Sequence, residues 1–121
     1  MKLPILIFVI FATLHFSCKE EVDHVCSVRN PIEDLPWLAA DIQEMKQSGL
    51  SQYLYVTRAM HESNPVFIYA NCCPYCNSIT PVYDCSGNEI GVIGDGKDNI
   101  PPSILDHDIV IWRADNFACT L

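Results

Sequence analysis

The spacing of apolar residues predicts one amphipathic helix followed by a series of strands. In residues 34–48 apolar side chains recur at steps of three and four, which places them on one face of a helix. These side chains are Leu35, Leu38, Ala39, Ile42 and Met45. Asp34 is a candidate N-cap, Pro36 suits the first turn, and Gly49 stops the helix. We therefore expect a helix with one face to bury.

From Gln52 the period changes to two, which is typical of strands. Residues 52–60 alternate between apolar and polar, and residues 66–70 form a second apolar run. The turn residues Glu62-Ser63-Asn64-Pro65 separate these runs, so the pattern predicts a hairpin.

A second hairpin is predicted around Cys85-Ser86-Gly87-Asn88, which lies between the apolar stretches 79–84 and 89–93. Pro101-Pro102 can begin a short helical turn through Leu105, and residues 109–113 predict a last strand. Because strands joined by short turns cannot be parallel, we expect an α+β fold. In this fold one amphipathic helix packs on a four- to five-stranded, mostly antiparallel sheet.

The N-terminal residues have the order of a secretory signal. Lys2 precedes an unbroken apolar run from Leu3 to Phe16, and Ser17-Cys18 follows it. The run is too short to span a bilayer, and a lipoprotein peptidase can cut before a cysteine placed in this way. We predict a lipoprotein signal peptide in residues 1–17, a lipidated tether in residues 18–25 attached at Cys18, and a single domain in residues 26–121.

The alternative is an ordinary signal peptide, with Cys18 as one half of a disulfide. The charged residues 19–23 resemble the acidic segment that directs some Bacteroidota lipoproteins to the cell surface. We therefore expect an exported protein, lipid-anchored to the cell envelope at the outer membrane or cell surface. Its membrane contact would be made through the lipidated Cys18.

The charge of the chain argues against one class of partner. The sequence has 15 acidic and 7 basic residues, with a net charge of −8. Such a surface repels phosphate backbones, so we expect no nucleic-acid partner.

Six cysteines remain once Cys18 is assigned to lipid. An even number in an oxidising compartment predicts up to three disulfides among Cys26, Cys72, Cys73, Cys76, Cys85 and Cys119. A Cys26–Cys119 bridge is the simplest clamp for both ends of the domain. The other four can pair as Cys72 with Cys85 and Cys73 with Cys76, or in the crossed arrangement, and sequence alone does not choose.

The segment Cys73-Pro74-Tyr75-Cys76 resembles the thioredoxin and glutaredoxin active site, because an apolar strand runs into it. The resemblance implies an attacking thiolate at Cys73 and a resolving thiol at Cys76. The turn at residues 84–88, however, breaks any helix after Cys76, and too few residues follow for the rest of that fold.

Other chemistry lacks the necessary spacing. Cys73 and Cys76 form half of a zinc ribbon without a second closely spaced pair. The loop Gly94–Asn99 lacks the spacing of a calcium loop and the glutamate at its twelfth position. The sequence contains no recognisable hydrolase triad order or phosphate loop. We expect no metal, no cofactor and no catalytic residue.

Four short motifs are spread over the domain, namely Pro36-Trp37-Leu38, Asn71-Cys72-Cys73, the segment 82–88 and Gly94-Asp95-Gly96. With these motifs the domain resembles a family of small secreted Bacteroidota lipoprotein domains of unknown function. The resemblance implies export, disulfides and an α+β fold, and it brings no activity.

The sequence thus predicts a cell-envelope lipoprotein that acts as a non-catalytic binding or interaction module, with an envelope protein as partner. Exposed aromatic side chains could form the contact surface, namely Tyr53, Tyr55, Tyr69 and Tyr75. The favoured alternative is that these tyrosines only cover the second face of the sheet. The alternative function is a periplasmic or surface thiol-disulfide oxidoreductase that uses Cys73 and Cys76.

Overall fold

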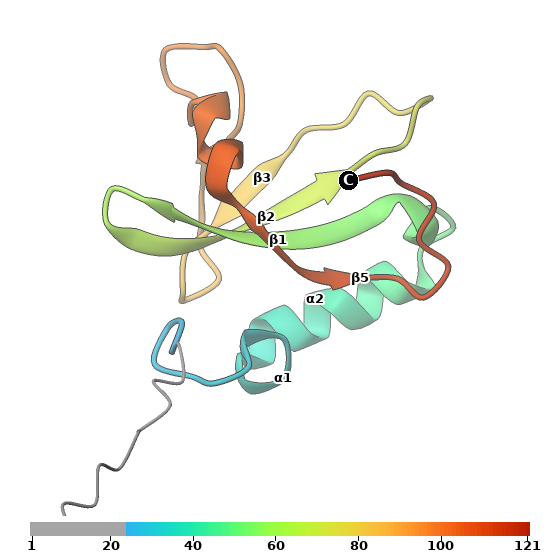
Figure 1. Cartoon of the computed structure of the whole chain (residues 1–121), viewed down its shortest axis with the longest axis horizontal. Helices are drawn as coiled ribbons and strands as arrows, with labels where there is room; N and C mark the ends of the chain where they lie inside the picture. Colours follow the sequence, from blue (N-terminus) through green and yellow to red (C-terminus); the bar gives the residue numbers. More distant parts are fainter. Residues whose placement is uncertain (1–23) are drawn as a thin grey trace, which may run out of the picture.

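The computed structural model describes residues 24–121. The predicted signal peptide, residues 1–17, and the lipid attachment site, Cys18, lie outside this range. The described chain has the expected α+β fold, with a five-stranded antiparallel sheet of order β4-β3-β2-β1-β5. Helix α2 lies along one face of this sheet (Figure 1).

The predicted helix of residues 34–48 begins two residues later in the structure, and a separate short helix precedes it. Helix α1 spans Pro31–Asp34 and helix α2 spans Pro36–Gln47. Leu35 between them is extended, with φ −95° and ψ 106°, because a proline disfavours the helical conformation of the preceding residue. Asp34 is therefore not the N-cap of the long helix. Its carboxylate instead accepts a hydrogen bond from the backbone N–H of Asn30 at 3.0 Å.

The first hairpin consists of β1, Leu54–His61, and β2, Asn64–Asn71. Its turn is tighter than the sequence predicts, because only Glu62 and Ser63 join the strands and Pro65 pairs with Met60 inside the ladder. Both turn residues have positive φ, 50° and 66°. This is the backbone of a two-residue turn whose twist matches that of the flanking strands.

The second hairpin consists of β3, Pro81–Tyr83, and β4, Glu89–Val92. Its loop is organised by the side chain of Asp84, whose Oδ1 accepts hydrogen bonds from the backbone N–H groups of Ser86 and Asn88, both at 2.9 Å. These bonds favour the charged form and lower the pKa of Asp84, with Asn88 as the main cause. The loop is thus fixed by a carboxylate exposed to solvent.

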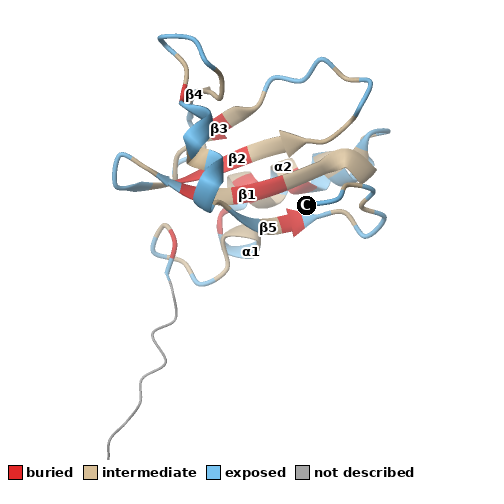
Figure 2. Cartoon of the chain, turned by 45° about the horizontal axis from the view of Figure 1, so that its top comes forward, coloured by how far each residue is buried: buried red, intermediate tan, exposed pale blue. Residues whose placement is uncertain are grey.

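The last strand, β5, spans Ile109–Arg113 and pairs with β1 at the other edge of the sheet. The chain reaches it through the short helix η2, Pro102–His107, which contacts β1 on the face opposite helix α2. Figure 2 shows this face, with the buried residues in the middle strands. Another short helix, η1, spans Ser51–Tyr53 and leads into β1.

The described residues form one core on each face of the sheet. Helix α2 covers the first through Leu38 and Ile42, which pack with Val56, Phe67 and Trp112. The second core lies on the η2 side and consists of Ala59, Val66, Ile68, Val82 and Ile100. Thr57 is only 1% exposed, and its hydroxyl has no hydrogen-bond partner among residues 24–121. No helix in this range is long and apolar enough to cross a bilayer.

Candidate functional site

The Cys73-Pro74-Tyr75-Cys76 segment lies in an exposed loop. Residues 72–80 join β2 to β3 without helix or strand, and the loop projects from one end of the sheet (Figure 1). Tyr75 is 91% exposed and Ile79 is 74% exposed. The side chain of Asn71 accepts a hydrogen bond from the backbone N–H of Cys73 at 2.8 Å, so the start of the loop is held while its tip faces solvent.

This geometry differs from a thioredoxin site in one essential respect. In that site a helix begins at the two cysteines, and its N-terminus stabilises the attacking thiolate. Here residues 77–80 contain no helix, and the next element is strand β3. Cys73 and Cys76 are joined to each other, with Cα atoms 5.4 Å apart. The local sequence resemblance therefore does not extend to the fold.

The other two disulfides differ from the expected pairs. Cys26 is bonded to Cys85 and Cys72 to Cys119, with Cα–Cα distances of 5.5 and 6.1 Å. The expected Cys26–Cys119 and Cys72–Cys85 bridges are wrong, whereas Cys73–Cys76 is one of the pairs that the sequence left open.

The reason for this pairing is the path of the two chain ends. The N-terminal segment enters beside the tip of the β1–β2 hairpin, where Val25 and Met60 line the same pocket. The C-terminal segment runs beside the start of β1, where the backbone N–H of Ala118 donates to Gln52 at 2.9 Å. The two ends therefore lie at opposite ends of strand β1, and each is bridged to the cysteine nearest to it (Figure 1).

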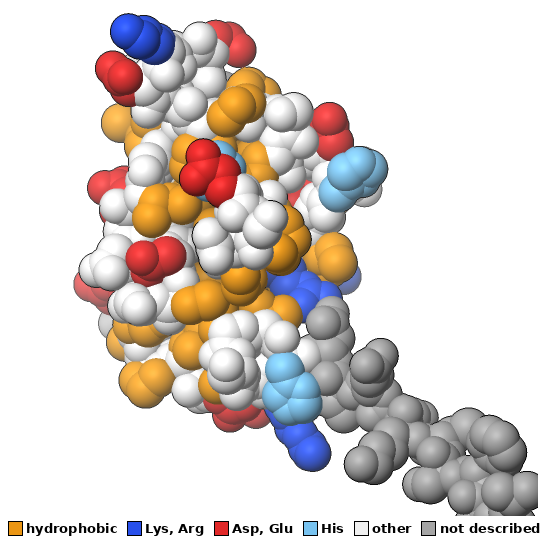
Figure 3. Space-filling model, turned by 90° about the vertical axis from the view of Figure 1, so that its left-hand side faces the viewer, with side chains coloured by type: hydrophobic (Ala, Val, Ile, Leu, Met, Phe, Trp, Pro, Cys, Tyr) orange, Lys and Arg blue, Asp and Glu red, His pale blue; other side chains and the backbone are white. Residues whose placement is uncertain are grey.

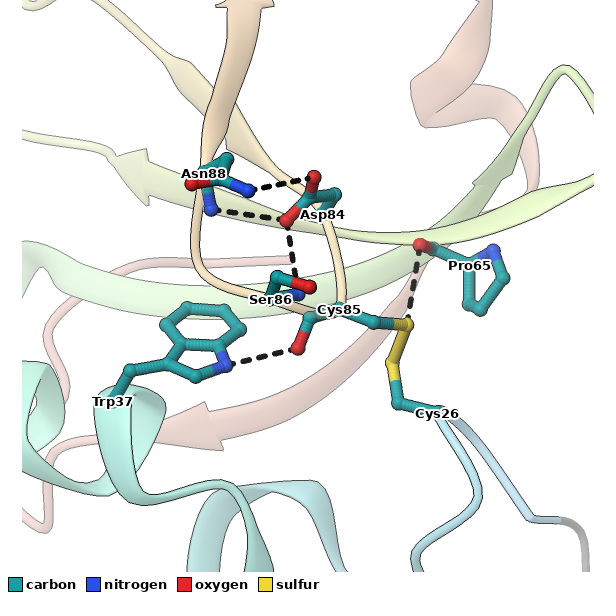
Figure 4. Close-up of a disulfide and its surroundings, with 7 residues drawn as sticks. All are labelled: Cys26, Trp37, Pro65, Asp84, Cys85, Ser86 and Asn88. Atoms are coloured by element: carbon teal, nitrogen blue, oxygen red, sulfur yellow. Dashed lines mark hydrogen bonds between the residues drawn. A yellow bond between two sulfur atoms is a disulfide. The ribbon is translucent and has the colours of Figure 1, made fainter.

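The Cys26–Cys85 bridge lies beside the ring of Trp37 (Figure 4). The indole N–H of Trp37 donates to the carbonyl oxygen of Cys85 at 3.0 Å, and its ring meets that of Phe67 edge-on at 5.6 Å. Gly87 has φ +81°, and a Cβ atom placed on it would lie 2.7 Å from the indole ring. The N-terminal segment, helix α2 and the β3–β4 loop are thus locked together at one point.

A pocket of about 470 Å³ lies next to this locked region, between the N-terminal segment, the β1–β2 hairpin and the start of β5. Its apolar lining comes from Val25, Ala59, Met60, Pro65 and Ile109. Its polar lining comes from His24, Arg58 and His107. We call it the His24 pocket. It combines an apolar wall with basic side chains, and none of the residues from 24 to 121 that line it is Asp or Glu.

Sequence reasoning missed this pocket, although one signal was present. Arg58 lies between Val56 and Met60 on the same side of strand β1, and a charged residue within an otherwise apolar stripe marks a place where the core ends. His24 and Ile109 line the pocket together with Arg58, and they come from the N-terminal and C-terminal parts of the domain. No local pattern relates them.

A second hollow, of about 780 Å³, lies on the other side of Pro65 and has a different character. Its lining includes three carboxylates, those of Glu62, Asp84 and Asp98. They do not come together as a metal site, because no group of three or more His, Cys, Asp or Glu within residues 24–121 has the geometry to hold an ion.

The four tyrosines expected to form a contact surface do not share one face. Tyr69 lies on the helix side, where its hydroxyl donates to Oδ2 of Asp41 on α2 at 2.6 Å. Burial raises the pKa of Tyr69, and the hydrogen bond to Asp41 raises it further. Tyr55 stacks edge-on against Phe117 instead, and Tyr75 projects from the 72–80 loop. The predicted aromatic surface is therefore wrong.

Comparison with known proteins adds no relative. No protein-family model matches the chain, and searches of curated proteins and of solved structures give no match either. The structure itself defines the class as a small, disulfide-stabilised α+β domain with an antiparallel sheet.

Proposed function

We propose that this chain is an exported, lipid-anchored binding module of the cell envelope, without catalytic activity. The observation that carries the proposal is the His24 pocket, which lies six residues from the predicted lipid attachment site at Cys18. Six residues span at most about 20 Å when fully extended. A domain anchored at Cys18 would therefore hold this pocket close to the bilayer.

The disulfides support a binding role because they fix the walls of the pocket in advance. His24 and Val25 directly precede Cys26, whose bridge to Cys85 ties them to the sheet. Ligand pockets are usually largely preformed, with an apolar lining and a few well-placed polar groups, and range from about 300 to 1,000 Å³. The His24 pocket has this composition and size.

Anchoring is tested by replacing Cys18. Cells expressing wild-type protein are fed an alkyne-tagged fatty acid, and the label and membrane fraction are measured. We expect Cys18→Ser to abolish the label and release the protein, whereas the matched variant Cys26→Ser keeps both. Continued labelling of Cys18→Ser would refute lipid attachment at this residue.

Binding is tested by capture from envelope extracts, with folded bait confirmed by circular dichroism. The pocket variant Met60→Asp/Ile109→Asp is compared with the loop variant Tyr75→Asp/Ile79→Asp, which changes two exposed large side chains elsewhere. We expect wild type and the loop variant to enrich the same protein or lipid component, and the pocket variant to lose it. Absence of any enriched component with wild-type bait would contradict the proposal.

The second candidate is a thiol-disulfide oxidoreductase. The exposure of the Cys73–Cys76 loop favours it, because a surface disulfide is accessible to an attacking thiolate. The missing helix after Cys76 argues against it. This function predicts insulin-reducing activity that Cys73→Ser abolishes, and lack of activity in the wild-type protein would exclude it.

A further inference from the structure

We propose that the Cys73–Cys76 disulfide is a redox switch for the 72–80 loop, which a reducing dithiol opens while the rest of the domain stays folded. The inference makes no use of the His24 pocket and so goes beyond the proposed function. It also differs from the oxidoreductase considered above, because a switch keeps the electrons in its own two cysteines and passes none to a substrate protein.

The bridge closes a single exposed β-turn. The backbone N–H of Cys76 donates to the carbonyl oxygen of Cys73 at 3.4 Å, and Pro74 holds the second position, where its fixed φ suits a turn. Both central residues of the turn, Pro74 and Tyr75, are exposed. Neither Cys73 nor Cys76 packs against a core of the described residues. Opening the bridge therefore releases the turn without disturbing either core.

The loop is held at both ends by bonds that do not involve this bridge. At its start the backbone N–H of Cys72 donates to the carbonyl oxygen of Tyr53 at 3.0 Å. At its end the backbone N–H of Ile93 donates to the carbonyl oxygen of Thr80 at 2.9 Å. Reduction should therefore change the conformation of residues 74–79 and stop at these two points.

The other two bridges have a different setting, because each ties a chain end to the sheet. Cys26 packs against the core on the helix side, and Cys119 follows Ala118, whose backbone N–H is bonded to Gln52. Opening either bridge would loosen a chain end, whereas Cys73–Cys76 connects no separate elements. Among disulfides, exposed ones are typically the labile or regulatory ones.

The loop is also free of charge, which matters because the attacking group is an anionic thiolate. The chain has a net charge of −8, yet residues 71–83 include no Asp, Glu, Lys, Arg or His. Figure 3 shows the opposite end of the molecule, where acidic and basic side chains lie around a hydrophobic band. The segment 71–83 therefore adds no carboxylate that would repel an approaching thiolate.

The reaction is a two-electron exchange. One thiolate of the dithiol attacks a sulfur of the Cys73–Cys76 bond, forms a mixed disulfide and displaces the other cysteine as a thiolate, which takes up a proton. The second thiol of the reagent, as its thiolate, then attacks the mixed disulfide. The dithiol leaves as a disulfide, and Cys73 and Cys76 are left as two thiols. Because only two residues separate these thiols in the chain, oxidation closes the same turn again.

The test is a redox titration of the purified native protein in mixtures of reduced and oxidised dithiothreitol. Free thiols are alkylated and located by peptide mass spectrometry, while circular dichroism and backbone amide chemical shifts follow the fold. We expect Cys73 and Cys76 to be labelled together at a reduced-to-oxidised ratio at least about tenfold below that for any other cysteine. Shifts should be confined to residues 73–80, and oxidised reagent should restore the starting spectrum.

Variants test whether the turn sets the switch. In Cys73→Ser/Cys76→Ser the same low ratio should produce no shift changes, because the bridge is absent. Pro74→Gly gives the open chain more conformational freedom, so the pair should open at a ratio lower by about two- to fivefold. The matched control is Pro101→Gly, which changes another exposed proline, outside the loop, and should leave the ratio unchanged.

Three results would overturn the inference. The first is a Cys73–Cys76 bond that opens only together with Cys26–Cys85 or with loss of the folded signal. The second is label on Cys72 or Cys119 in the same step, which would show exchange with the neighbouring bridge. The third is shift changes that spread over the sheet. The capture experiment is independent of these outcomes, since it reports on the His24 pocket, and insulin reduction by the wild-type protein would identify the enzyme instead of the switch.

Discussion

Removal of the Cys26–Cys85 bridge should destabilise the domain about twice as much as removal of Cys73–Cys76. The first bridge spans 59 residues of sequence and the second spans 3. In the chain-entropy model the long loop is worth about 4 kcal/mol and the short one about 2 kcal/mol. The variant Cys26→Ala/Cys85→Ala therefore serves as the perturbation, and Cys73→Ala/Cys76→Ala is the matched control with the same pair of substitutions.

Packing adds to the difference. Cys26 holds Val25, which is 8% exposed and belongs to the core on the helix side, and Cys85 accepts the indole hydrogen bond of Trp37. The Cys73–Cys76 bridge closes a loop whose tip contacts solvent. Loss of the long bridge should therefore also loosen the N-terminal segment, whereas loss of the short one should leave the core unchanged.

The assay is thermal unfolding by circular dichroism, with hydrogen exchange as a local probe. For a domain of this size each kcal/mol corresponds to roughly 4–8 °C in Tm, so we expect a fall of roughly 15–30 °C for the long bridge and roughly half of that for the short one. The amides of Val25 and Val28, which exchange hydrogen bonds at 3.2 Å, should lose protection only in the first variant. Equal losses of Tm in the two variants would refute the reasoning.

Three further outcomes are expected. Gly87→Ala should lower the free energy of unfolding by about 1–3 kcal/mol in chemical denaturation, because the new methyl group meets Trp37 and the positive φ is strained. Gly49→Ala is the control and should be nearly neutral, because the space around Gly49 is open. Thr57→Val should stabilise the domain by about 1 kcal/mol in the same assay, because it removes a buried hydroxyl without a partner in the described chain; a loss of stability would contradict this. The lowered pKa of Asp84 contributes stability above the unfolded value of 3.8 that disappears as pH falls through the lower folded pKa. Asp84→Asn should therefore be less stable than wild type at pH 7, and the difference should vanish in acid once Asp84 is protonated in the folded state as well. A difference that persists in acid would count against the loop bonds.

The elements of this fold could be predicted because they depend on local patterns. The step of three and four residues from Leu38 to Met45 lies within α2, and both hairpins lie where alternation and turn residues place them. The break at Leu35 could also have been predicted from the sequence, since Pro36 disfavours the helical conformation of the residue before it. The turn was predicted over residues 62–65, but its two-residue form at Glu62-Ser63 was not, because neither residue is one of those that favour positive φ.

The candidate site depends on contacts between distant residues, which sequence patterns do not contain. The cysteine pairs follow from the opposite positions of the two chain ends along β1, and these positions are set by the placement of β5 at the sheet edge. Arg58 and Ile109 are paired across that same edge. A hydrophobic pattern predicts that β5 is a strand, but it does not say which strand is its neighbour. The pocket could therefore not be predicted from the sequence.

The interleaving of two disulfides has a consequence for what a protease can do to the domain. Cys26–Cys85 and Cys72–Cys119 overlap in sequence, since Cys72 precedes Cys85. Every peptide bond between Cys26 and Cys119 is therefore enclosed by at least one bridge. A protease that nicks the exposed 72–80 loop, or any other single point in this span, leaves two pieces that stay covalently joined. A domain cut once in this span remains one covalent molecule.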